Sequence, residues 1–268
     1  MKKRFFLPVL AAAVFLLGNA SSSAASGAMW YQPPSMAPPG NAYSFSSETQ
    51  VPSQVADDFY FEGGFPIVGV TWWGSYWDTT YQDSTYFPYP NSDSWGDPAQ
   101  NPPGVVSGFI ISFYADISEG QGVPPWGHPG SLLYAATIPM DGVQLAETPY
   151  GAINRDASTQ TVFQYDASLP IPFVQDPEKV CWLSIQAIDP GGSPLQWGWQ
   201  ESMDHWNGNA VQHGFSSKGW WDLLPGEDMA YKLNCVPIPP SLILFGAGCL
   251  GLIGLRRRPK RGAGSTIV

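Results

Sequence analysis

Residues 179–188 read K-V-C-W-L-S-I-Q-A-I, and this stretch decides the fold class. Its apolar positions recur at every second residue, which places on one face Cys181, Leu183, Ile185 and Ala187. The opposite face carries Trp182, Ser184 and Gln186. A β-strand has this period because its successive side chains point to opposite sides of the sheet. The stretch therefore predicts a strand with one face in a hydrophobic core.

The same pattern extends along the middle of the chain. Residues 229–234 alternate in the same way, and Gly and Pro interrupt nearly every gap between apolar runs. Further strands are predicted at residues 55–61, 67–76, 108–114, 131–138, 161–165 and 195–200. Short strands with no helical stripe between them favour an all-β fold. We expect a two-sheet sandwich, jelly-roll-like in its strand order, over residues 54–234.

Two segments of the middle lack apolar periodicity. Residues 29–53 and residues 78–104 are rich in Pro, Ser, Asn and Gly. Such composition is typical of loops. The first segment is predicted to be an irregular lead-in to the domain, and the second a long surface loop.

Charge divides the 268-residue chain into basic ends and an acidic middle. Eight of the 12 Lys and Arg residues lie within residues 2–4 or 256–261, whereas all 22 Asp and Glu residues fall between Glu48 and Asp228. A nucleic-acid partner requires clustered basic residues, so the acidic middle excludes that class of partner. The aromatic content of 14% supplies enough apolar surface to disfavour disorder.

The N-terminus has the three parts of a secretory signal peptide. Lys2, Lys3 and Arg4 form a positive region, and an apolar run follows over residues 5–17. Small residues then offer cleavage points for signal peptidase after Ala24, Ala25 or Ala28. The alternative is a membrane anchor, but the apolar run is short against the roughly 20 residues that a span needs. We expect residues 1–28 to be removed on export.

The C-terminus has the pattern of a membrane anchor. An apolar run over residues 240–255 is followed by a basic cluster within residues 256–261. Arginines at the end of such a run stay on the cytoplasmic side, so residues 262–268 are predicted to be a cytoplasmic tail and the acidic middle to lie outside. The alternative, a buried core helix, does not explain five positive charges directly after the apolar run.

Residues 235–261 also resemble the sorting tail of PEP-CTERM proteins, which has a proline motif, a glycine-rich apolar span and an arginine cluster. The matching residues are Val236, Pro237, Pro239, Arg256, Arg257 and Arg258. Ile238 stands where the usual tail has Glu, so the match is closer to the V-P-x-P variant tails. The resemblance implies a Gram-negative producer of exopolysaccharide, transient anchoring, and processing by an exosortase-type membrane protease.

The middle domain resembles an uncharacterised family of secreted bacterial β-proteins. The similarity rests on five islands, which are A-D-D-F at residues 56–59, W-W-G-S-Y at 72–76, W-L-x-I-x-A at 182–187, W-G-W at 197–199 and D-H-W-N at 204–207. Their order and spacing cover most of residues 54–234. This resemblance implies no activity.

Two cysteines of the middle are candidates for a disulfide bond. Cys181 lies in a predicted strand and Cys235 lies at the end of the last one. Export would place both in an oxidising compartment where a bond between them can form. The alternative is two reduced cysteines, with one packed as a small hydrophobic residue.

Catalytic templates are mostly absent from the sequence. It contains no G-x-S-x-G elbow, no H-E-x-x-H and no phosphate-binding glycine loop. Glu201 and Asp204 are the best acid/base candidates, because glycosidases flank the scissile bond with two carboxylates. The alternative is structural, with Asp204 and Asn207 capping a turn and His205 satisfied by local hydrogen bonds. We expect no enzyme activity.

Aromatic side chains suggest glycan binding, because Trp and Tyr rings stack on sugars while nearby polar groups bind hydroxyls. The candidate residues are Trp72, Trp73, Tyr76, Trp197, Trp199, Asp204, His205, Trp206 and Asn207. The alternative is that these tryptophans fill the core of the sandwich. A flat face of exposed tryptophans would favour adhesion, whereas carboxylates gathered around a cleft would favour an enzyme.

No cofactor is predicted, and calcium is the only metal that the sequence suggests. Residues 91–97 fail as an EF-hand because Trp95 occupies a ligand position. A looser site could use Asp57, Asp58 or Asp78. Solvated surface acids are the alternative.

Together these features predict an exported protein of the cell envelope or extracellular matrix, with a structural, adhesive or glycan-associated role. The expected partners are signal peptidase, an exosortase-type enzyme and exopolysaccharide, with a membrane as the transient anchor site. The alternative function is a secreted carbohydrate-active enzyme that uses Glu201 and Asp204. Composition and spacing do not predict the oligomeric state.

Overall fold

The computed structural model describes residues 27–36, 44–50, 53–63, 65–78, 106–122, 124–155, 158–191, 195–214, 216–223 and 226–236. Most of the predicted signal peptide, almost all of the predicted surface loop at 78–104, and all but the first two residues of the sorting tail lie outside these ranges. The predicted spanning segment 240–255 also lies outside the described ranges. In the part of the chain that is described, no helix is long and apolar enough to cross a membrane.

The described residues form strands and no helix, which confirms the all-β prediction. The strands are β1 (Gly27–Gln32), β2 (Ser44–Ser46), β3 (Ser53–Tyr60), β4 (Pro66–Asp78), β5 (Gly108–Ile117), β6 (His128–Pro139), β7 (Leu145–Arg155), β8 (Ser158–Val174), β9 (Val180–Ile188), β10 (Leu195–Ser202), β11 (Val211–Gly214), β12 (Ser216–Asp222), β13 (Asp228–Met229) and β14 (Tyr231–Cys235).

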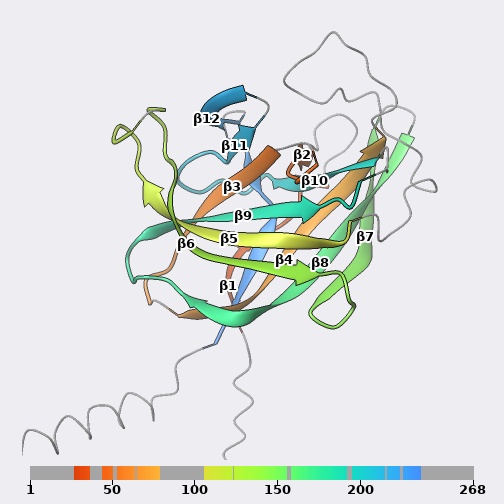
Figure 1. The fold of residues 1–268 in the computed structure, drawn as a ribbon, viewed down its shortest axis with the longest axis horizontal. Coiled ribbons are helices and arrows are strands. Elements are labelled where there is room, and N and C mark those ends of the chain that lie inside the picture. Colours follow the sequence, from red (N-terminus) through yellow and green to blue (C-terminus); the bar gives the residue numbers. More distant parts are fainter. Residues whose placement is uncertain are drawn as a thin grey trace, which may run out of the picture.

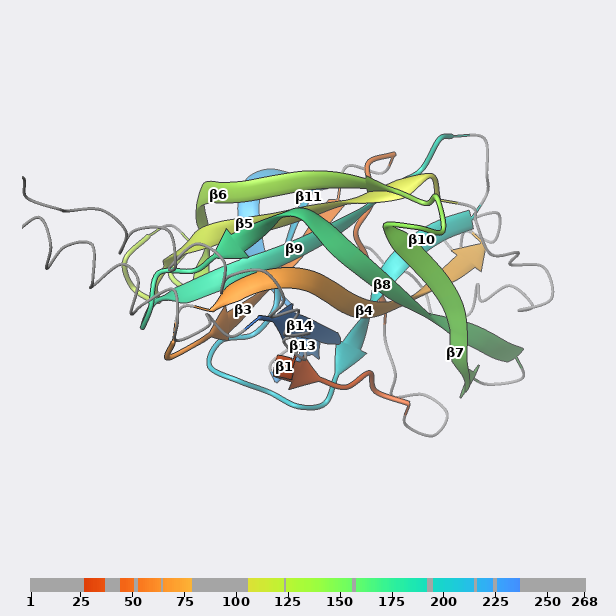
Figure 2. The ribbon, with the colours of Figure 1, turned by 90° about the horizontal axis from the view of Figure 1, so that it is seen from below.

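The strands make two antiparallel sheets that lie face to face (Figures 1 and 2). One sheet has the order β12-β11-β3-β9-β5-β6, and Figure 1 views it from outside. The other contains β1-β14-β4-β10-β13, with β2 paired to β10 and β8 paired to both β4 and β7. Strand β3 of one sheet leads directly to β4 of the other, so the chain crosses between layers at short turns.

The core between the sheets is built largely from aromatic rings. Trp72 on β4 stacks on Tyr165 of β8 at a centroid distance of 5.4 Å. Phe109 of the opposite sheet meets Trp72 and Trp197 edge to face, each at 4.9 Å. Such edge-to-face pairs add to the free energy gained from burying apolar area. The alternating face predicted for residues 179–188 enters this core through Leu183, Ile185 and Ala187 of β9.

The predicted irregular lead-in at residues 29–53 is wrong in part, because it contains strands. Residues 27–32 form β1, which pairs with β14, and residues 44–46 form β2, which pairs with β10. Both pairings join segments that lie far apart in the sequence. Their backbone hydrogen bonds come from distant partners, so local composition does not reveal them.

We expect Gly74→Ala on β4 to destabilise the protein. A Cβ atom at this position would lie 2.4 Å from Cζ2 of Trp197, whose ring is fully buried and has no room to move. Overpacking of this kind costs roughly 1–3 kcal/mol. The free energy of unfolding, measured with denaturant, should fall by that amount.

Gly127→Ala is the matched control for this substitution. Its Cβ would lie 3.5 Å from Cζ2 of Trp182, which is ordinary van der Waals contact. The control should leave the free energy of unfolding nearly unchanged. Equal effects of the two substitutions would contradict the packing proposed around Trp197.

Candidate functional site

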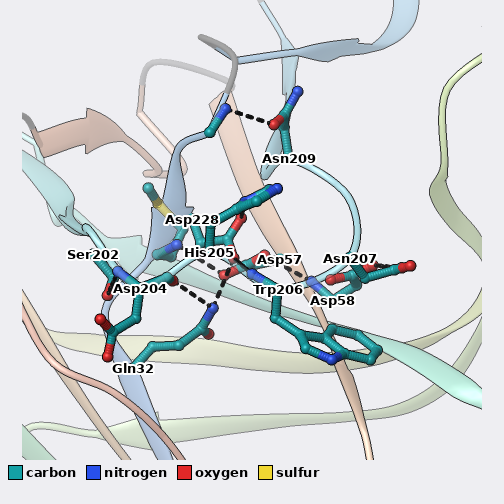
Figure 3. Close-up of polar contacts among 12 residues, drawn as sticks. Gln32, Asp57, Asp58, Ser202, Asp204, His205, Trp206, Asn207, Asn209 and Asp228 are labelled. Atoms are coloured by element: carbon teal, nitrogen blue, oxygen red, sulfur yellow. Dashed lines mark hydrogen bonds and ion pairs between the residues drawn. The ribbon is translucent and has the colours of Figure 1, made fainter.

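The strongest candidate site is the loop of residues 203–210, which joins β10 to β11 and carries the D-H-W-N island. Asp204, His205 and Asn207 are exposed on this loop, and Trp206 is half-buried. The loop lies over buried aspartates contributed by β3 and β13 (Figure 3). We name these residues the 203–210 loop.

Asp228 at the start of β13 holds the loop from beneath. Its carboxylate is fully buried and accepts a hydrogen bond from the backbone N–H of Trp206 at 2.7 Å. It also accepts one from Nε2 of Gln32 on β1 at 2.8 Å, and Nδ1 of His205 lies 3.0 Å from its other oxygen. One carboxylate therefore binds β1, β13 and the loop together.

Asp58 on β3 holds the other end of the loop. The side-chain amide of Asn207 donates to Oδ2 of Asp58. Asn207 has a φ angle of 60°, and Asn is among the residues that tolerate this left-handed conformation best. Oδ1 of Asp58 is buried and has no hydrogen-bond partner among the described residues.

Asp57 joins the two sheets beside the loop. It precedes Asp58 on the strand, so its side chain turns to the opposite face, toward the space between the sheets. There Oδ2 of Asp57 accepts the backbone N–H of Met229 on β13 at 2.8 Å. The hydroxyl of Tyr231 on β14 donates to the carbonyl of Asp58 at 2.7 Å, which adds a second link between the layers.

Burial raises the pKa of all three carboxyl groups. The pKa of Asp58 rises to about 8 and that of Asp228 to about 6, in both cases mainly through desolvation of the charged form. The pKa of Asp57 is raised well above its ordinary value by burial and by repulsion from Asp228 and Asp58. The hydrogen bonds to Trp206 and His205 oppose the shift at Asp228.

Two aromatic rings flank Trp206 on the surface. Trp30 of β1 meets it edge to face at 5.0 Å, and Tyr60 of β3 lies nearly parallel to it at 6.2 Å. All three rings are half-buried. Figure 3 shows the indole of Trp206 projecting away from Asp228. The site thus combines aromatic rings with the exposed polar groups of the loop.

The structure divides the predicted glycan-binding residues into two groups. Asp204, His205, Trp206 and Asn207 come together on the 203–210 loop. The other five are at most 3% exposed and lie in the interior, namely Trp72, Trp73, Tyr76, Trp197 and Trp199. Those five are corrected to packing residues, because a ring without an exposed face cannot stack on a sugar.

The predicted acid/base pair does not face one cleft. Glu201 is 2% exposed and lies in β10, where it is paired with Met229 of β13. Asp204 is exposed on the 203–210 loop. A glycosidase needs both carboxylates against the same substrate, and this arrangement does not supply that.

Sequence reasoning missed the aspartate that organises the site. Asp228 lies in a two-residue strand that begins 23 positions after His205, and no motif connects the two. Gln32 was likewise hidden inside the supposed lead-in. The only signal was the acidic pair Asp57–Asp58, which was considered for calcium instead.

The candidate disulfide is absent from the structure. Cys181 and Cys235 are both buried free thiols. Cys181 lies on β9 and Cys235 on β14, strands that belong to different sheets. Burial raises the pKa of each thiol to about 12, so both are packed as small hydrophobic groups.

The site has no arrangement for a metal ion. Among the residues described, no group of three or more His, Cys, Asp or Glu side chains could hold one. Asp57 and Asp58 turn to opposite faces of β3 and cannot converge on one ion. The side chain of Asp78, the third residue considered for calcium, is outside the described part of the structure.

Comparisons with known proteins give one match. A family model described as a domain of unknown function (DUF7901) matches residues 28–234. No curated protein and no solved structure matches the chain. The matched range runs from β1 to β14, so it includes both sheets and the 203–210 loop.

We expect the folded protein to lose stability as the pH rises. Each raised pKa means that the folded state binds a proton more tightly than the unfolded chain does. The stability that such a group contributes is complete below its ordinary pKa of 3.8. It is lost as the pH rises through about 6 for Asp228 and through about 8 for Asp58. The free energy of unfolding, measured with denaturant, should therefore be higher near pH 5 than near pH 8.

Asp58→Asn should reduce the difference between the free energies of unfolding near pH 5 and near pH 8 by at least about 1 kcal/mol, because one pKa unit is worth about 1.4 kcal/mol. The amide oxygen can still accept the hydrogen bond from Asn207. Asp176→Asn, at an exposed carboxylate, is the control and should leave the pH dependence in place. A free energy of unfolding that rises between these pH values would contradict the assignment.

Proposed function

The chain belongs to the DUF7901 family, and on that premise we propose that it is an exported protein of the cell envelope or extracellular matrix with a non-catalytic, glycan-associated role. Its host would be a Gram-negative bacterium that produces exopolysaccharide. The basic and apolar segments at the two ends support export, and the 203–210 loop supports contact with a glycan.

The loop is the observation that carries the glycan part of the proposal. Asp228 holds the loop backbone at Trp206 and Asp58 holds the side chain of Asn207 through part-buried hydrogen bonds, so less conformational entropy remains to be lost on binding. Trp206 and Tyr60 supply aromatic surface, which favours the apolar faces of sugar rings. Asp204 and His205 are exposed beside them and suit hydroxyl groups.

The enzyme alternative has less support. Of its two carboxylates, Glu201 is buried within a sheet while Asp204 lies on the surface. We therefore propose adhesion or structural association with polysaccharide and no turnover of it.

The sorting proposal concerns the two termini. Gly27 of β1 pairs with Cys235 of β14. Cleavage after Ala28 would remove Gly27 from this strand, so the pairing favours signal cleavage after Ala24 or Ala25. Because β14 ends at Cys235, the proline motif that starts at Val236 directly follows the last strand, and we propose that the processing enzyme reads it there. We also propose that the sandwich is of the jelly-roll class and that residues 240–255 form a spanning helix.

Trp206→Ala should weaken binding to exopolysaccharide from the producing strain by at least about tenfold, equivalent to about 1.4 kcal/mol. The reason is loss of the aromatic surface while the backbone bond to Asp228 remains. Affinity electrophoresis of the folded variant in gels that contain the polysaccharide measures the change.

Two variants control for this result. Trp206→Phe keeps an aromatic ring and should retain most of the binding. Tyr150→Ala removes an exposed ring on β7 and should have no effect. Failure of the unaltered chain to bind any member of a broad glycan panel would overturn the glycan proposal, and release of new sugar ends would overturn its non-catalytic part.

Replacing Pro237 and Pro239 together with Ala should leave the protein in the inner membrane. Recognition by the processing enzyme is expected to need the proline motif, whereas the apolar run and its arginines would still anchor the chain. Membrane fractionation and immunoblotting measure the distribution. Release equal to that of the unaltered protein would contradict the sorting proposal.

A further inference from the structure

Strand β6 is a free edge of the six-stranded sheet. Among the described strands its only ladder partner is β5. Residues 134–139 pair with residues 108–113 without a register shift, so this half of the strand is regular. A regular edge strand presents a row of unpaired N–H and C=O groups that another strand can bind. Figure 2 shows β6 at the outer margin of its layer.

The edges formed by β7 and β12 carry features that block pairing, whereas residues 134–138 of β6 do not. Strand β7 contains Glu147 and Pro149 and has a register shift at that proline. Strand β12 contains Lys218 and Asp222, with a register shift between β11 and β12. The 12 residues of β6 include no Asp, Glu, Lys or Arg. Charged residues, prolines and bulges are the usual protection of an edge, and the regular half of β6 has none before its final Pro139.

Exposed apolar side chains border the same edge. Leu132 and Leu133 on β6 are 55% and 51% exposed, while Ile171 and Val174 on β8 are 68% and 59% exposed. Leu133 and Val174 line one surface cavity, and the ring of Tyr134 lies 5.9 Å from that of Phe173, so β6 and the end of β8 are neighbours. These side chains extend the free backbone edge into an apolar rim.

We propose that this edge joins two copies of the chain by antiparallel pairing of β6 with β6. An antiparallel edge is complementary to itself, because a twofold axis brings the same donors and acceptors opposite one another. The uncharged edge also suits a second copy of a chain whose surface is otherwise acidic. Two such chains repel each other least where neither carries charge.

The paired edges would make one continuous sheet from two six-stranded sheets. Residues 134–138 would form the central ladder, with the exposed side chains of Ala135 and Thr137 next to the twofold axis. The apolar rim of each copy would lie at the margin of this contact. The dimer does not depend on the glycan proposal, since the 203–210 loop lies outside β6.

The mass of the full chain in solution, measured by light scattering with the detergent contribution subtracted, tests this inference. The unaltered chain should change from one to two copies as its concentration rises through the micromolar range. Thr137→Lys places a charge at the edge of both copies and should abolish the dimer. Thr148→Lys, the same change at an exposed position on β7, should leave it intact.

A second measurement does not need a variant. The backbone amides within residues 134–138 that face away from β5 should exchange hydrogen more slowly at high protein concentration than at low concentration, while amides of β7 should not change. A chain that stays monomeric at all concentrations would overturn the inference. So would a dimer that survives Thr137→Lys, which would indicate pairing through another surface or through the tail.

Discussion

Asp228 binds two segments that are distant in the sequence: β1, through the side chain of Gln32, and the 203–210 loop, through the ring of His205 and the backbone of Trp206. Asp57 beside it accepts the N–H of Met229 and so joins β3 of one sheet to β13 of the other. Leaving a buried acceptor unpaired costs about 1–3 kcal/mol, so these segments hold one another in place. The position of the 203–210 loop and the closure of the sandwich at this end depend on the same carboxylates.

The two ends of the core are held by different kinds of contact. Trp72, Tyr165 and Trp197 pack as rings, and their contribution comes mainly from apolar burial that hardly responds to pH. The aspartate cluster is polar, and its contribution depends on protonation because burial penalises the charged carboxylate. The 203–210 loop is therefore held by carboxyl groups, Asp58 and Asp228, whose ionisation is costly because they are buried. That arrangement suits a binding surface that must keep its shape without a bound ligand.

Strand prediction succeeded where apolar residues alternate. It missed β7, β11 and β12, which form local hairpins, and it missed two strands that depend on distant partners. Residues 180–188 and 231–235 form β9 and β14 because their side chains alternate between core and surface. Strands β1 and β2 were missed, since their backbone groups pair with β14 and β10 from the far end of the chain. For the candidate site, the D-H-W-N island was identified from its polar and aromatic density. Asp228, which holds that island in place, was not.

The sequence by itself determined the all-β class, the acidic character of the middle and the different character of the two ends. These are properties of local period and composition, which need no knowledge of distant contacts. Tertiary structure alone decided that five predicted glycan-binding aromatics are interior, that Cys181 and Cys235 are unbridged thiols, and that Asp57 meets a strand 172 positions away. The reason is that such contacts form only when the two sheets close on each other, and a strand pattern does not specify which strands become neighbours.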